Sequence, residues 1–159
     1  MSKTLVVNNI PFQYPTDQDD PGWGGQATDW ASEVTDVLAN VVGPDDIIDT
    51  SANIVDAQST FTNIPGLSFN IGSVQSAEVD YNIYRTSTGT PNGIVETGKI
   101  ILVYNQADTA WTMGQGDIVG DAGVTFQITS LGQIQYKSST LGAGHVGIIK
   151  FSAKAKTQV

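Results

Sequence analysis

The residues best suited to chemistry are few in this sequence. It has one histidine, His145, and no cysteine, so neither a histidine-rich metal site nor a thiolate site can be built. No Gly-x-Ser-x-Gly segment is present that would set a nucleophilic serine on a strand-to-helix turn. We interpret His145 as an ordinary residue beside a glycine-rich turn. The sequence predicts no catalytic residue, no metal site and no cofactor, and therefore not an enzyme.

The acidic residues suggest cation binding only superficially. The segment that begins at Asp17 resembles the start of a calcium loop, but Thr28 stands at position twelve, where an EF-hand needs an acid. Asp45, Asp46 and Asp49 could gather a cation, and we interpret them instead as part of a solvated linker. A loop-bound cation stays conceivable, whereas an EF-hand does not.

Two further patterns could indicate paired catalytic carboxylates or a phosphate-binding loop. Glu78 and Asp80 share one face of a predicted strand, about 7 Å apart, but this is the polar face and no cleft is implied. Gly114 and Gly116 precede the sequence DIVG rather than a helix, so we expect a turn there and not a phosphate-binding loop.

One helix is predicted, over residues 22–43, between a polar turn and the pair Gly43-Pro44. Its apolar positions are spaced alternately four and three apart, which is a coiled-coil seam. The seam consists of Trp23, Ala27, Trp30, Val34, Val37 and Val41. It must be buried against its own β domain, a second copy of the chain, or a larger partner.

The remainder of the chain has the two-residue period of β-strands. We predict strands over residues 51–58, 60–70, 76–86, 95–105, 109–113, 123–129, 133–139 and 145–155. The run KIILVY at 99–104 is continuously apolar after its lysine, so we expect a strand buried on both faces. Pro91-Asn92-Gly93 and Ser130-Leu131-Gly132 are predicted as hairpin turns.

These patterns divide the chain into four parts. Residues 1–21 are predicted as an extended N-terminal arm, 22–43 as an amphipathic anchoring helix, 44–51 as a linker and 52–159 as a β domain. The fold class is mainly all-β: an antiparallel β-sandwich, jelly-roll-like, because short strands alternate with glycine-rich turns.

Charge is distributed unevenly along the chain. Up to residue 56 there are ten acids against one base, and beyond it six against six, so the net charge of −9 belongs to the first third. An acidic chain is a poor ligand for nucleic acid. No signal-peptide core and no apolar run of membrane-spanning length is present. We therefore expect neither a nucleic acid nor a membrane as partner.

The segments PFQYP, PGWGGQATDWASEVTDVL and GVTFQITSLGQIQYKSS resemble small virion structural proteins of tailed bacteriophages, of the marine and cyanophage type. The resemblance implies a fibre, head-fibre or capsid decoration protein, often trimeric, made in the host cytoplasm and located in the virion. It also implies that the arm and helix attach to the particle. The attachment positions are Pro11, Phe12, Tyr14, Pro15, Trp23, Gly24, Ala27, Thr28, Trp30 and Ala31.

We expect a non-enzymatic virion protein whose arm and helix seam contact other virion proteins of the capsid, neck or tail, or symmetry mates, a homotrimer being favoured. The absence of a long shaft favours a short fibre or a decoration (cement) protein. The alternative is a carbohydrate-binding adhesin module for a host glycan, supported by Trp111 on a predicted edge strand and by an exposed Tyr84. For Trp111, a role in the core or in a subunit contact is the more common one. A small hydrolase is a third possibility, but nothing in the sequence indicates that its carboxylates lie in a cleft.

Overall fold

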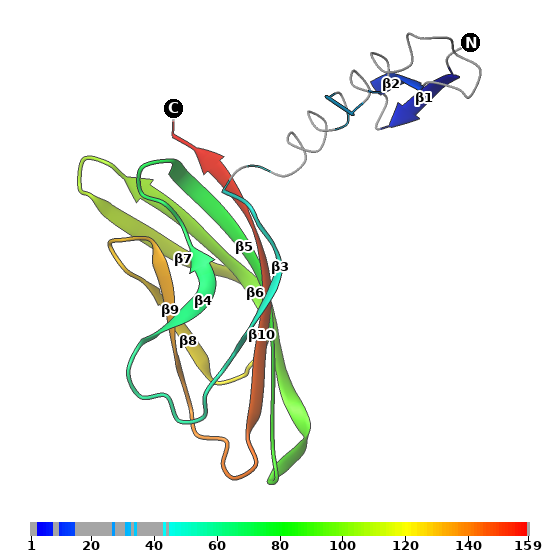
Figure 1. The fold of residues 1–159 in the computed structure, drawn as a ribbon. Helices are drawn as coiled ribbons and strands as arrows, with labels where there is room; N and C mark the ends of the chain where they lie inside the picture. Colours follow the sequence, from blue (N-terminus) through cyan, green and yellow to red (C-terminus); the bar gives the residue numbers. More distant parts are fainter. Residues whose placement is uncertain are drawn as a thin grey trace. The chain divides into compact units, whose positions relative to one another are not determined.

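The computed structural model describes residues 3–7, 10–14, 27, 31–32, 34, 43 and 45–158. The chain divides into two compact units, residues 1–44 and residues 45–159 (Figure 1). Each unit is considered by itself below.

The N-terminal unit begins with a hairpin. Strand β1 (Lys3–Val7) pairs antiparallel with β2 (Ile10–Tyr14), with Lys3 opposite Tyr14 and Val7 opposite Ile10. The extended backbone expected for the arm is present, but the chain folds back on itself instead of running straight. Ala27, Ala31, Ser32 and Val34 have helical backbone, as expected within residues 22–43. The rest of the predicted helix lies outside the described residues.

The C-terminal unit contains eight strands in two antiparallel sheets. The first sheet has the order β3-β10-β5-β6-β7 and the second has the order β4-β9-β8. The strands are β3 (Ile47–Asn53), β4 (Thr62–Ser68), β5 (Val74–Ser87), β6 (Thr90–Asn105), β7 (Ala110–Gly120), β8 (Val124–Ile128), β9 (Gln133–Ser138) and β10 (Val146–Thr157).

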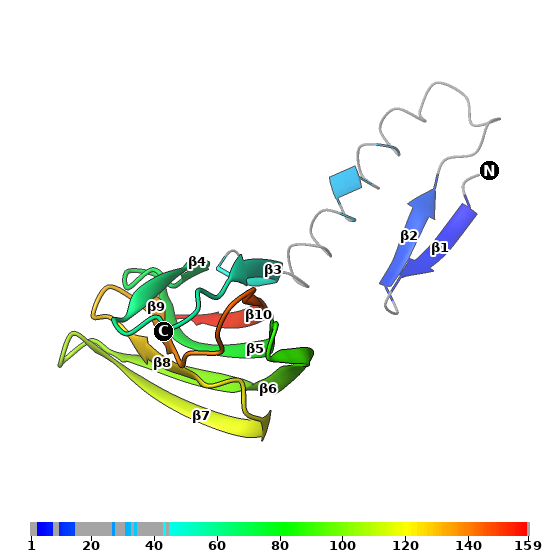
Figure 2. The ribbon, with the colours of Figure 1, turned by 90° about the horizontal axis from the view of Figure 1, so that it is seen from below.

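The three-stranded sheet lies over one face of the five-stranded sheet (Figure 1, Figure 2). Alternate residues of both sheets point into one shared core, which confirms the all-β antiparallel sandwich. Tyr81 of the larger sheet meets Phe126 of the smaller with ring centroids 5.1 Å apart. Ile64, Ile83, Ile100 and Ile134 are fully buried in this core.

The jelly-roll part of the prediction is wrong. A jelly roll distributes eight strands over two sheets through two Greek keys. Here β5, β6 and β7 follow one another as neighbours in one sheet, as a meander. The reason is local, because a two-residue turn at Thr88-Gly89 returns β6 directly along β5, with Ser87 opposite Thr90.

Three local predictions also need correction. Pro91-Asn92-Gly93 lies inside β6 and is not the hairpin turn, although Gly93 has the positive φ of 73° that its sequence suggested. Residues 114–120 belong to β7, where a register shift and Asp117 at φ 51° form an irregularity instead of a turn. Residues 47–51 of the predicted linker are part of β3, an edge strand that pairs with β10.

The strand at 99–104 is buried on one face only. Ile100 and Leu102 are fully buried, whereas Ile101 and Val103 are about half exposed on the outer face of the five-stranded sheet. The smaller sheet covers a single face of the larger one, so every second residue of β6 remains at the surface. The expected burial on both faces is therefore wrong, and an apolar outer surface takes its place.

Candidate functional site

The predicted anchoring residues lie in the N-terminal unit. Pro11, Phe12 and Tyr14 belong to β2, and Ala27 and Val34 are half-buried residues with helical backbone. Pro15, Trp23, Trp30, Val37 and Val41 lie outside the described residues. Their role in attachment stays a prediction.

Arg85 forms the centre of a polar cluster that sequence reasoning missed. Its side chain is fully buried and all five N–H donors of the guanidinium are used. Nε donates to His145 Nε2 at 3.1 Å, and Nη2 donates to Asp56 Oδ1 at 3.0 Å and to the Ser139 carbonyl at 2.6 Å. Nη1 donates to the Ala122 carbonyl at 2.6 Å and to Ser139 Oγ at 3.4 Å. One side chain of β5 thus ties together three connecting segments.

A signal for Arg85 was present in the sequence. The inward positions of β5 are Ala77, Val79, Tyr81 and Ile83, and the next position of the same parity is Arg85, the one arginine of the chain. An arginine on the buried face of a strand requires partners, since an unpaired buried charge is costly. Its partners could not be named from the sequence because they lie 29 to 60 residues away.

Asp56 is the acidic partner in the cluster. Its carboxylate accepts the N–H of Leu141 at 2.6 Å and that of Gly142 at 3.0 Å, in addition to Arg85. The Leu141 N–H above all, with Gly142, His145 and Arg85, holds the pKa of Asp56 below its ordinary value. The segment after β3 and the loop before β10 are joined through this one carboxylate.

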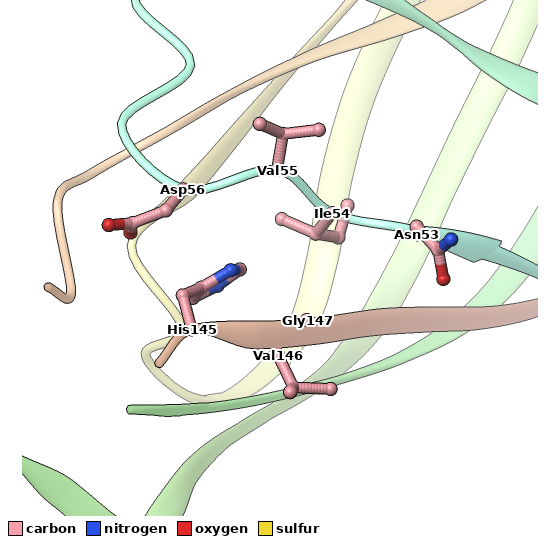
Figure 3. A pocket seen from close by; sticks show the side chains of 7 residues that line it. All are labelled: Asn53, Ile54, Val55, Asp56, His145, Val146 and Gly147. Carbon is pink, nitrogen blue, oxygen red and sulfur yellow. The ribbon is translucent and has the colours of Figure 1, made fainter. Parts of the chain in front are cut away.

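His145 lines a small open hollow of about 470 Å³ together with residues 53–56 and 146–147 (Figure 3). Nε2 of the imidazole already accepts a hydrogen bond from Arg85 Nε. A Ser-His-Asp nucleophilic arrangement would need this nitrogen to receive a serine proton. Ser139, His145 and Asp56 each contact Arg85 instead, an arrangement that suits support of the loops.

A second carboxylate, this one buried, continues the network. Glu96 of β6 accepts the Tyr81 hydroxyl at 2.9 Å and the Ala122 N–H at 2.8 Å. The Ala122 peptide units therefore bridge Glu96 and Arg85, one through the N–H and the next through the carbonyl. Burial, followed by the neighbouring Glu96, raises the pKa of the Tyr81 phenol.

Three of the other acids considered in the sequence, Glu78, Asp80 and Asp46, interact with basic or backbone groups. Glu78 and Asp80 are exposed and both pair with Lys99 on the facing strand, and the Lys99 hydrogen bond lowers the pKa of Glu78. Asp46 accepts the Lys154 ammonium and the Ala155 N–H, both at 2.7 Å. Within the described part of the chain, no group of three or more His, Cys, Asp or Glu could hold a metal ion.

The two aromatic candidates for sugar binding, Trp111 and Tyr84, differ in the face of the sheet on which they lie. Trp111 faces the core from the edge strand β7, where it packs against Phe69 and Tyr104 with centroids 6.3 and 5.1 Å away. Of the two roles considered for Trp111, packing against the core is the one observed, and the ring is not exposed for stacking on a sugar. Tyr84 lies on the outer face of the five-stranded sheet and is 43% exposed.

Tyr84 belongs to an apolar row across the outer face of the five-stranded sheet. In the strand register Val95 of β6 lies opposite Tyr84 of β5, which lies opposite Ile148 of β10. Val95 is half exposed and Ile148 is exposed to 36%. This row is followed along the strands by polar residues, Thr97, Asn82 and Lys150. The outer face is therefore the candidate contact surface of this unit.

No protein-family model matches the sequence, and no curated protein matches it. Among solved structures, the chain is similar to part of the tailspike protein of Acinetobacter phage vB_ApiP_P1, with 15% sequence identity and a TM-score of 0.40. The match covers 70% of this chain and 21% of the tailspike chain. The match thus spans about a fifth of the length of the tailspike chain. Among the described residues, no helix is long and apolar enough to cross a membrane.

Proposed function

We propose that this chain is a non-enzymatic structural protein of a bacteriophage virion, either a capsid decoration (cement) protein or a short head or tail fibre. The N-terminal unit attaches to other virion proteins and the β unit projects from the particle. The protein assembles as a homo-oligomer, with a trimer favoured by the resemblance of the arm and helix to phage virion proteins.

The observation that carries the proposal is the division of the chain at residue 44. The β unit closes its core with its own two sheets, and its core residues all lie between Ala52 and Ala153. Among the described residues, this core is formed by the β unit itself. We infer that the predicted seam is buried against another protein, which is the arrangement expected of an anchor.

The polar cluster supports a structural role for the β unit. The Arg85 guanidinium of β5 and the Glu96 carboxylate of β6 connect these two strands with three loop segments through hydrogen bonds whose partners are protein groups. A network of this kind rigidifies the end of a sandwich. A rigid, self-contained β unit on a separate anchor suits a protein that must survive outside a cell as part of a particle.

The test is incorporation into particles. We expect the chain lacking residues 1–44 to stay folded but to be absent from purified virions, as measured by mass spectrometry of separated heads and tails. The double variant Trp23→Ala/Trp30→Ala should reduce incorporation, because it removes the largest seam side chains. Asp29→Ala/Glu33→Ala, on the same helix but off the seam, is the matched control. Normal incorporation of the truncated chain would show that the anchor is assigned wrongly.

A further inference from the structure

The outer face of the five-stranded sheet carries a polar depression. Two adjoining hollows of about 330 and 250 Å³ share Asp49 and Lys150 as lining residues. Together they are lined by side chains of β3, β10, β5 and β6, and we call them the Asp49–Lys150 hollow. The other polar side chains that line it are Thr50, Ser51, Asp80, Asn82, Thr97 and Ser152.

Several of these polar side chains have unused hydrogen-bond donors and acceptors. Within residues 45–158, Asp49, Asn82 and Lys150 make no side-chain hydrogen bond or ion pair. Thr97 donates its hydroxyl to the Tyr81 carbonyl at 3.0 Å and keeps its own acceptor positions. The hollow therefore offers carboxylate and amide acceptors together with amide and ammonium donors.

The hollow has no excess of positive charge. Its charged lining residues are two carboxylates, Asp49 and Asp80, and one ammonium, Lys150. Asp80 lies 3.4 Å from Lys99, which also pairs with Glu78. A phosphorylated or polyanionic ligand would therefore be disfavoured here. A neutral ligand rich in hydroxyl groups avoids this repulsion and matches the mixture of donors and acceptors.

The aromatic ring of Tyr84 lies next to the hollow on the same face of the sheet. Tyr84 follows Asn82 on the same face of β5, two residues further along the chain, a distance of about 7 Å along the strand. The ring rests on Gly93, where a Cβ atom would come within 2.5 Å of Tyr84 Cε2. The absence of a side chain at Gly93, together with its positive φ of 73°, leaves room for the 43% exposed ring to lie against the sheet.

We propose that the Asp49–Lys150 hollow and the Tyr84 ring together bind a neutral oligosaccharide. One sugar unit stacks its C–H face on Tyr84, as aromatic side chains with one exposed face allow. The next units place their hydroxyl groups against Asn82, Asp49 and Lys150. This site lies on the β unit and goes beyond the anchoring role, so it does not depend on which part of a virion holds the chain.

The experiment uses the full chain and an immobilised array of purified bacterial O-antigen and capsular oligosaccharides. The best neutral oligosaccharide is then titrated in solution by calorimetry. We expect Tyr84→Ala to weaken binding roughly tenfold through loss of stacking. Asn82→Ala/Lys150→Ala should weaken it by about the same factor or more. Tyr84→Phe keeps the ring and should bind as the unaltered chain does.

Val103→Ala, at an exposed position of the same sheet outside the hollow, is the matched control and should leave binding unchanged. Thermal unfolding of each variant separates loss of binding from loss of fold. The proposal is overturned if no oligosaccharide on the array binds. It is equally overturned if binding is indifferent to both Tyr84→Ala and Asn82→Ala/Lys150→Ala. Neither result alters the expected incorporation into particles, which depends on residues 1–44.

Discussion

Arg85 and Asp56 show how much of this fold depends on single polar side chains. Arg85 places a permanent charge in a fully buried position. The hydrogen bonds that its five N–H groups donate compensate for the lost hydration. Asp56 supplies the opposite charge and also accepts two backbone N–H groups of the loop before β10. The conformation of that loop is thereby coupled to the ionisation of one carboxyl group.

This coupling predicts a pH dependence of stability. The pKa of Asp56 is lower in the folded chain, so its contribution is present above the unfolded value near 3.8 and is lost as the pH falls through the folded value. Asp56→Asn should therefore lower the free energy of unfolding at pH 7. The difference from the unaltered chain should shrink as the pH falls below about 4. Urea denaturation at a series of pH values measures this difference.

Asp49→Asn is the control for that experiment, since Asp49 is exposed and has no hydrogen-bond partner among residues 45–158. Its stability profile should run parallel to that of the unaltered chain. A difference for Asp56→Asn that stays constant from pH 7 to pH 2 would contradict the role given to the ionised carboxylate.

At the scale of the elements, β6 carries the clearest difference between expectation and structure. The apolar run at 99–104 predicts burial on both faces, but only one face meets the second sheet. Periodicity describes each strand alone and cannot say how many layers a domain has. The same reasoning explains β7, where glycines typical of a turn lie on an edge strand with open space beside Gly114 and Gly116.

Neighbouring isoleucines in β6 test this arrangement directly. Ile100→Ala should destabilise the chain by about 2–5 kcal/mol, because it removes a fully buried side chain and leaves a cavity. Ile101→Ala, one residue along and 51% exposed, should change the free energy of unfolding by only about 0.5 kcal/mol. Chemical denaturation of the two variants gives both values. Equal destabilisation would mean that the outer face of β6 is covered.

At the scale of the whole molecule, the boundary at residue 44 separates two units with different ratios of acids to bases. Residues 1–44 contain six acids against one base, whereas residues 45–159 contain ten acids against six bases and the described core. Asp46, just after the boundary, is bound to Lys154 and the backbone of Ala155, so the β unit includes the contacts that secure its own start.

The isolated segment 45–159 should therefore fold alone. We expect one cooperative thermal transition, with a midpoint within about 4 °C of the β unit in the full chain, since a change of this size corresponds to roughly 1 kcal/mol in a domain of this length. Scanning calorimetry of both proteins makes the comparison. A segment that lacks a cooperative transition would show that residues 1–44 complete the fold.

The sequence alone determined the features that depend on neighbours along the chain: the all-β class, most of the strands after residue 60, the Ser130-Leu131-Gly132 turn, and the position of the acidic charge. Tertiary structure alone decided the division into five and three strands, the partners of Arg85, the inward side of Trp111 and the hollow beside Tyr84. The reason is that strand pairing and burial join residues separated by tens of positions. Local periodicity places a side chain on one of two faces, and only the packed sheets determine which face meets a core.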